Sequence, residues 1–125
     1  MKATAKQPAK LNTMLRDIEE QLDRGIANHR DLFSAADFAD GLGRKEVGRH
    51  LRIEAHIVAK KRLLEFAVIF GDDYGTDNIA RGLRSIARLE QKAADAIRSG
   101  DVRRAVELHR KVERQSVWPT AIGIL

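Results

Sequence analysis

From Arg44 to Phe70 the sequence contains no proline and a single glycine, Gly48. An α-helix over this run makes about seven turns. Gly71 then opens a turn-forming stretch that continues to Gly75, and glycine just past the last turn is a common helix stop. The run therefore predicts one long central helix that ends near residue 70.

The segment before this run has a helical apolar period. Leu11, Leu22 and Ile26 belong to a stripe with spacings of three and four residues, which predicts a first helix to about residue 32. Residues 34–37, Ser-Ala-Ala-Asp, have the pattern of a capping box with Asp in place of Glu. We therefore expect a short extra helix that begins there and is closed by Gly41 and Gly43.

Two more helices are indicated after the central run. An apolar stripe from Ile79 to Ile97 has helical spacing. Ser99-Gly100-Asp101 then places a C-terminal glycine directly before an N-cap residue, so the last helix is expected to fold straight back. Pro119 should stop that helix.

The composition agrees with helices. Of the 125 residues, 43% are hydrophobic and only 5% aromatic, which suits amphipathic helices better than a sandwich of short strands. The predicted fold class is all-α, an antiparallel bundle of about four helices with a short extra helix between the first and the long central one. We expect a flexible basic tail over residues 1–10, a single domain over 11–119 and a C-terminal tail over 120–125.

Several classes of protein find no support in the sequence. There are no cysteines, so a disulfide framework, a thiolate metal site and a cysteine nucleophile are excluded. No window approaches the about 18 apolar residues of a membrane span, and we expect a cytoplasmic protein without a membrane partner. The serines lack the glycine elbow of hydrolases and no phosphate loop is present, so no catalytic residue is indicated.

Ionisable residues fall on the inward faces when each helix is drawn at about 100° per residue. Of the histidines, only His56 falls on the solvent side. Counting residues from each chain reversal along the helix axis places three of these inward residues, Glu54, Glu90 and His109, within about one turn of each other. The inward set comprises His29, His50, Glu54, Glu90, His109 and Glu113.

Two interpretations of this set stay open. Imidazole nitrogens with carboxylate oxygens suit a non-heme metal ion such as iron or zinc, and helical bundles build such sites from facing interior positions. The same groups can instead satisfy one another as His–Glu hydrogen bonds inside the bundle, without any ion.

Residues 109–119, in which a His and a Glu one turn apart precede Trp-Pro, resemble the closing helix of hemerythrin-like proteins. The His50 and Glu54 pair is similar to the pair on that family's second helix, and His29 takes the place of the first-helix ligand. The resemblance implies a non-heme iron bundle that binds or senses oxygen or nitric oxide. The third helix departs from the family pattern, because it offers Glu90 where the family has a pair of histidines.

Basic residues form two stripes on the outer faces, and the net charge is +5. Such stripes can track a phosphate backbone or an acidic protein, but they are also ordinary solvated faces of helical bundles. Residues 39–51 are similar to a helix-turn-helix that is two residues shorter than usual. The stripes comprise Lys45, Arg49 and Arg52 on the central helix and Arg81, Arg84, Arg88 and Lys92 on the next.

The leading hypothesis is a small binding or regulatory protein in which the interior His/Glu set binds a metal ion. A nucleic-acid-associated protein that uses the basic stripes is the first alternative. A structural protein that forms a homo-dimer through its long central helix is the second.

Overall fold

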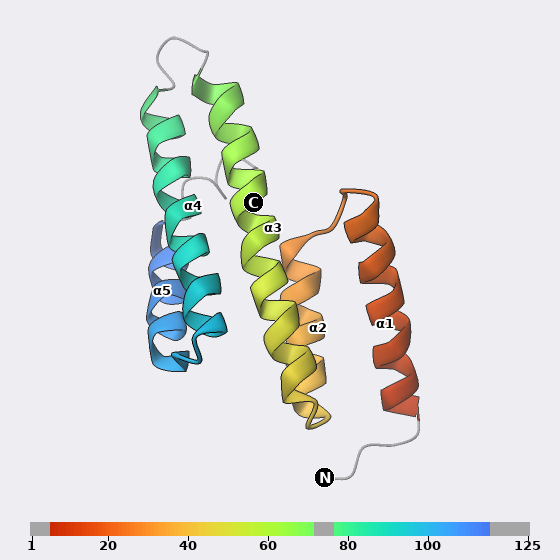
Figure 1. Cartoon of the computed structure of the whole chain (residues 1–125). Coiled ribbons are helices and arrows are strands. Elements are labelled where there is room, and N and C mark those ends of the chain that lie inside the picture. The colour runs from red at the N-terminus through yellow and green to blue at the C-terminus, as the bar shows by residue number, and fades with distance from the viewer. Residues whose placement is uncertain (1–5, 72–76, 116–125) are drawn as a thin grey trace. The chain divides into compact units, whose positions relative to one another are not determined.

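The computed structural model describes residues 6–71 and 77–115, and within them the chain forms five α-helices and no strand (Figure 1). These are α1 (Lys6–Asp23), α2 (His29–Gly41), α3 (Lys45–Gly71), α4 (Asp77–Arg98) and α5 (Val102–Gln115). The all-α prediction is confirmed, and so is the long central helix, α3, which has 27 residues.

Several predicted features lie outside the described residues: positions 1–5 of the basic tail, most of the turn after Gly71, the stop at Pro119 and the tail over 120–125. Helix α1 begins at Lys6, so residues 6–10 of the predicted tail are helical. No helix among the described residues combines the length and the apolar character needed to cross a membrane.

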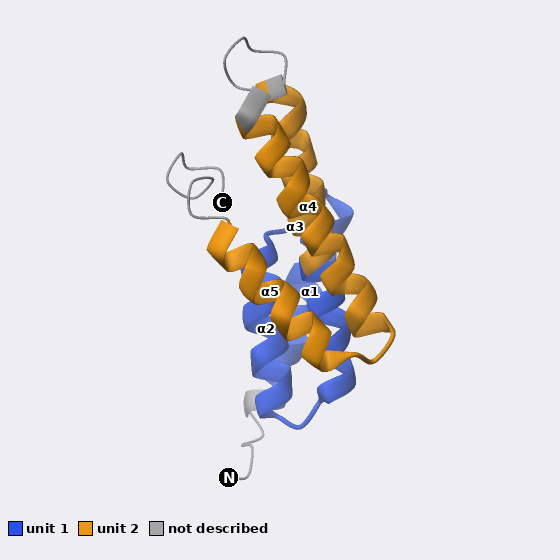
Figure 2. Ribbon diagram, turned by 90° about the vertical axis from the view of Figure 1, so that its left-hand side faces the viewer, with its two compact units in different colours: residues 1–55 blue, residues 56–125 orange. Residues whose placement is uncertain are grey.

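The chain divides into two compact units, residues 1–55 and 56–125, and the boundary falls inside α3 (Figure 2). Unit 1 contains α1, α2 and the first part of α3. Unit 2 contains the rest of α3 together with α4 and α5. The single domain over 11–119 stays a prediction; α3 continues through the boundary between the units without a helix breaker.

The first helix ends well before residue 32. Helix α1 stops at Asp23, and Gly25 follows with a φ of 70°, a left-handed conformation that glycine adopts at little cost. The Ile26 N–H donates to the Gln21 carbonyl at 3.0 Å, which closes the helix as in a Schellman motif. The predicted stripe therefore extends too far, and Ile26 is 59% exposed.

Helix α2 begins at His29 and not at the predicted capping box. Asn28 is the N-cap, since its side-chain oxygen accepts a hydrogen bond from the Arg30 N–H at 2.8 Å. Ser34, the predicted cap, is an exposed residue in the middle of the helix. The assignment of His29 to the first helix is therefore wrong, because a glycine stop and an asparagine cap separate it from the apolar stripe.

The end of α2 agrees with the sequence. The helix stops at Gly41, and Gly43 has a φ of 77°. The Arg44 N–H donates to the Ala39 carbonyl at 2.9 Å, which completes a second Schellman motif. Only residues 42–44 separate α2 from α3.

Helices α2 and α3 pack closely within unit 1. A Cβ placed on Gly48 would collide with the Asp40 carboxylate and would lie 3.1 Å from the Ala36 carbonyl oxygen. One turn further along α3, Arg52 makes ion pairs with Asp37 at 2.8 Å and with Asp40 at 2.7 Å. The two helices therefore run antiparallel and side by side (Figure 1), as in an αα-hairpin, and do not cross steeply as in a helix-turn-helix.

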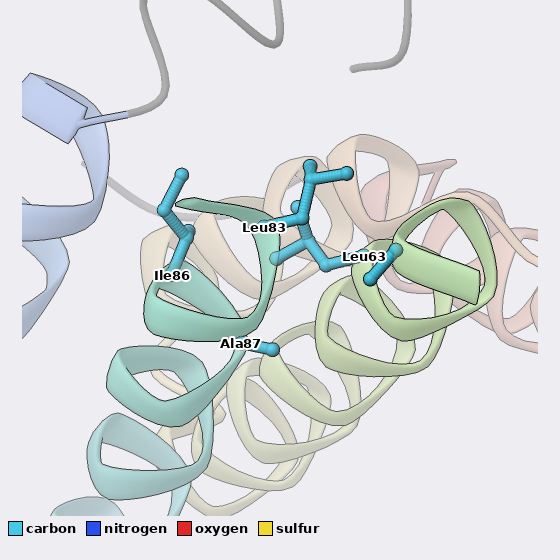
Figure 3. Packing of buried hydrophobic residues seen from close by; sticks show 5 residues of the cluster. Leu63, Leu83, Ile86 and Ala87 are labelled. Carbon is cyan, nitrogen blue, oxygen red and sulfur yellow. The ribbon is translucent and has the colours of Figure 1, made fainter. Parts of the chain in front are cut away.

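Unit 2 has a core made of leucine, isoleucine and alanine. Leu63 of α3 and Leu83 of α4 meet between the two helices (Figure 3). Phe66, Phe70, Ile79 and Val112 cover this cluster as partly buried residues. A second cluster joins α4 to α5 through Ala93, Ala96, Ala105 and Leu108.

The turn between α4 and α5 has the predicted signals. Gly100 has a φ of 81°, and the Asp101 N–H donates to the Ala96 carbonyl at 2.9 Å. The Asp101 side chain accepts a hydrogen bond from the Arg104 N–H at 3.1 Å, so Asp101 caps α5. The predicted glycine stop and the predicted N-cap are both confirmed.

We expect Gly48→Ala to destabilise the protein by about 1–3 kcal/mol, because the added methyl group must displace an aspartate that is already held by Arg52. Gly41→Ala is the matched control, since a Cβ there meets no atom within 4 Å. Urea unfolding of the two variants measures the difference. Equal unfolding free energies for both variants would contradict the close contact of α2 with α3.

Candidate functional site

The buried side of α3 differs from the side that its large apolar residues indicate. Leu64 and Val68 are 37% and 67% exposed. Small side chains allow neighbouring helix backbones to approach closely, and in unit 2 the side of α3 with Ala59, Leu63 and Ala67 packs. In unit 1 Leu51, Ile53 and Ala55 are buried, so the exposed branched residues lie in the second half of the helix.

Because the buried side of α3 differs from the predicted side, polar residues of α3 that were expected inside are exposed and one that was expected outside is buried. His50 and Glu54 are exposed, so their predicted inward orientation is wrong. His56, predicted to face solvent, is 2% exposed. A signal for His56 was present, because it stands three and seven residues before Ala59 and Leu63, on the same row of the helix.

His56 and Glu90 form a buried pair between α3 and α4. His56 Nδ1 lies 3.1 Å from Glu90 Oε2, and each side chain is 3% exposed. The predicted interior position of Glu90 is confirmed. The hydrogen bond gives each polar group a partner, without which burying it would cost several kcal/mol, on the order of 2–7.

His109 of α5 extends this pair toward the surface. The rings of His56 and His109 meet edge to face, with centroids 5.6 Å apart and an interplanar angle of 76°. His109 Nε2 lies 3.0 Å from Glu113 Oε1, one turn further along α5, where the Glu113 side chain is 65% exposed. We name these four residues, His56, Glu90, His109 and Glu113, the His/Glu cluster.

Of the predicted interior set, Glu90, His109 and Glu113 lie in unit 2, where His56 connects Glu90 to His109, whereas His29, His50 and Glu54 belong to unit 1. The predicted inward position of Glu113 is wrong, because its side chain is 65% exposed. Over residues 6–71 and 77–115, no group of three or more His, Cys, Asp or Glu side chains is arranged to hold a metal ion. The His/Glu cluster consists of two His–Glu pairs that are joined by the edge-to-face contact of the two imidazole rings.

The predicted basic residues of α3 are mostly engaged inside the protein. Arg52 is held by two aspartates of α2, and Arg49 lies 3.8 Å from Glu46. Lys45 is exposed at the start of the helix. Lys60, further along, donates a hydrogen bond to the Gln91 side chain of α4 at 2.7 Å.

The basic residues of α4 are in a different situation. All are exposed, and none makes an ion pair with a described residue. Asp95 stands at the end of the row, and its carboxylate contacts other residues of α4. Asp95 Oδ1 lies 3.4 Å from a guanidinium nitrogen of Arg98 and accepts a hydrogen bond from the Gln91 side-chain amide at 3.0 Å. We name the row the α4 stripe; it comprises Arg81, Arg84, Arg88 and Lys92.

Comparisons of the chain with models of protein families, with curated proteins and with solved structures find no match. The resemblance to hemerythrin-like proteins therefore rests on the residues quoted for it above and stays a prediction. The fold arranges two groups of side chains that are candidate sites, the His/Glu cluster and the α4 stripe.

We expect His56→Ala to lower the free energy of unfolding by about 1–3 kcal/mol, because it leaves the buried Glu90 carboxylate without its hydrogen-bond partner. His50→Ala, on the exposed side of the same helix, is the control and should change stability little. Chemical denaturation measures both variants. Two variants of equal stability would show that the buried pair contributes nothing to folding.

Proposed function

We propose that this chain is a nucleic-acid-associated binding module that contacts the phosphate backbone through the α4 stripe. The observation that carries the proposal is a row of exposed cations on one helix face that have no anionic partner among the described residues. Cations that are not neutralised within the protein are the ones that can exchange their counterions for phosphates.

The dimensions of the stripe support this partner. Its members are spaced by three, four and four residues, so they lie on one side of α4. Arg81 and Lys92 are about 16 Å apart along the helix axis. One strand of duplex DNA presents a phosphate about every 3.4 Å along its axis, so the stripe spans about five phosphates. Three of its members are arginines, whose planar guanidinium groups bind phosphate with two hydrogen bonds.

The basic residues of α3 are poorer candidates for the same role. Binding a phosphate with Arg52 would break its short ion pairs with Asp37 and Asp40. Those ion pairs link α2 to α3. Arg52 therefore stabilises unit 1, and its guanidinium group is already engaged when a ligand approaches. The α4 stripe can bind without disturbing any ion pair.

We expect the protein to bind duplex DNA at low salt with little sequence preference, because contacts to phosphate carry no base information. For four phosphate contacts, the log of the association constant should fall with the log of the salt concentration with a slope of about −3 to −4. Fluorescence anisotropy with a labelled duplex measures the slope.

Arg88→Gln should weaken this binding and reduce the magnitude of the slope by about one. Arg16→Gln is the matched control, since Arg16 is an exposed arginine of α1 and the charge change is the same. Absence of binding at low salt, or an equal effect of the two substitutions, would refute the proposal.

Metal binding by the His/Glu cluster is a second candidate function. The observation that favours it is the edge contact of two imidazoles, each of which also meets a carboxylate. Two imidazoles with carboxylates form a ligand set for zinc or iron(II). Binding would replace the two His–Glu contacts by metal–ligand bonds, so it requires the side chains of the cluster to rearrange.

We expect zinc or iron(II), if bound at the cluster, to raise the melting temperature by several degrees when added well above its dissociation constant. His109→Ala should abolish this shift, while His50→Ala should keep it. Metal analysis of the purified protein and calorimetry with added metal are the measurements. A protein without bound metal whose melting temperature does not respond to either ion would eliminate this function.

A further inference from the structure

We propose that two copies of this chain associate in antiparallel orientation through the side of α3 that faces away from α4. This surface, the outer face, lies entirely within unit 2. It comprises Ile57, Lys61, Leu64, Glu65 and Val68.

The outer face has the pattern of a helix-pairing seam. Ile57, Leu64 and Val68, together with Lys61, are spaced by four, three and four residues, which is the repeat of a coiled-coil interface. A helix that packs one side against its own core normally carries polar residues on the other side. Here the other side has Leu64 37% exposed and Val68 67% exposed, and neighbouring Ile69 is 62% exposed. Apolar side chains that are contiguous on a surface mark an interaction site.

The charges on the outer face identify the occupant as a second copy of the chain. Lys61 and Glu65 are both exposed, and neither makes an ion pair with a described residue. In an antiparallel pair centred near residue 63, each Lys61 lies level with Glu65 of the second copy, so two reciprocal ion pairs form. A parallel pair would instead set lysine against lysine and glutamate against glutamate, which is unfavourable.

The same alignment also matches the apolar residues. Ile57 of one copy is level with Val68 and Ile69 of the other, and the two Leu64 side chains lie near the twofold axis. The lysine at the centre of the seam is tolerated, because its aliphatic stem can cover the neighbouring leucine while its ammonium group reaches the edge. The antiparallel alignment of the outer face therefore places apolar residues opposite apolar residues and opposite charges level with each other.

The mass of the full chain in solution, measured by sedimentation equilibrium over a range of concentrations, tests the association. We expect a dimer at high concentration. Lys61→Glu or Glu65→Lys alone should weaken self-association by roughly tenfold or more, since each sets like charges opposite one another. The combined variant Lys61→Glu with Glu65→Lys should restore it, because the reciprocal pairs are rebuilt with their signs exchanged.

Val68→Lys should also disrupt the dimer, whereas Val102→Lys should not. Val102 is the matched control, because it is a 71% exposed valine of the same unit that lies on α5. A chain that is monomeric at every concentration overturns the proposal. A dimer that persists in Val68→Lys and in both single charge variants overturns it as well, because the copies then meet elsewhere.

The absence of cysteine in the sequence allows the orientation to be tested by disulfide cross-linking. In the antiparallel pair, two Leu64→Cys chains should cross-link, while two Val68→Cys chains should not, because these positions are about 15 Å apart along the axis. Disulfides need Cα atoms within about 7 Å. A mixture of Ile57→Cys and Val68→Cys chains should give the mixed cross-link. Efficient cross-linking of Val68→Cys with itself would show a parallel pair and overturn the proposed orientation.

Discussion

Helix α3 packs through a side on which small residues stand beside leucine and isoleucine. In unit 1 a Cβ placed on Gly48 would collide with the Asp40 carboxylate and would lie 3.1 Å from the Ala36 carbonyl oxygen of the α2 backbone. In unit 2 Ala67 is packed within the cluster between α3 and α4. Small residues at a helix contact bring the backbones together and gain dispersion energy from many atom pairs. In the second half of α3 this side packs, and Leu64 and Val68 of the other side remain exposed.

The same contact explains which parts of the fold were predictable. The inward side of α4 was predicted correctly, because its interior positions carry leucine and isoleucine, with Glu90 among them. In the second half of α3, Leu63 is buried whereas Leu64 and Val68 are exposed, so hydrophobic size alone does not identify the inner side there. A single apolar arc drawn over the whole helix includes His50 and Glu54 and leaves out His56. Tracing the row of alanines through Ala59 and Ala67 would have found it.

The turns show a second limit of periodicity. Gly100 and Gly43 were identified as helix ends, and both adopt the left-handed conformation that this role requires. Gly25 has the same conformation but was passed over, because Ile26 continued the apolar period beyond it. A single glycine and an asparagine cap three residues later outweigh one more apolar residue, since they fix the backbone and satisfy its end groups. A glycine stop and an N-cap residue therefore predict the end of a helix better than one further apolar residue predicts its continuation.

Apolar contacts such as those of Leu63 and Leu83 are not directional, so they fix the position of one helix along the other less strictly than hydrogen bonds do. Polar pairs between α3 and α4 remove this freedom. The His56 hydrogen bond to Glu90 and the Lys60 hydrogen bond to Gln91 join consecutive residues of α4 to positions one turn apart on α3. Sliding or rotating α4 by one residue would leave a buried carboxylate without its partner, which costs far more than a shift between methyl groups. The rotation of α4 also determines which of its residues face outward. The buried pair therefore acts together with Leu83, Ile86 and Ala87 to keep the α4 stripe on the outside.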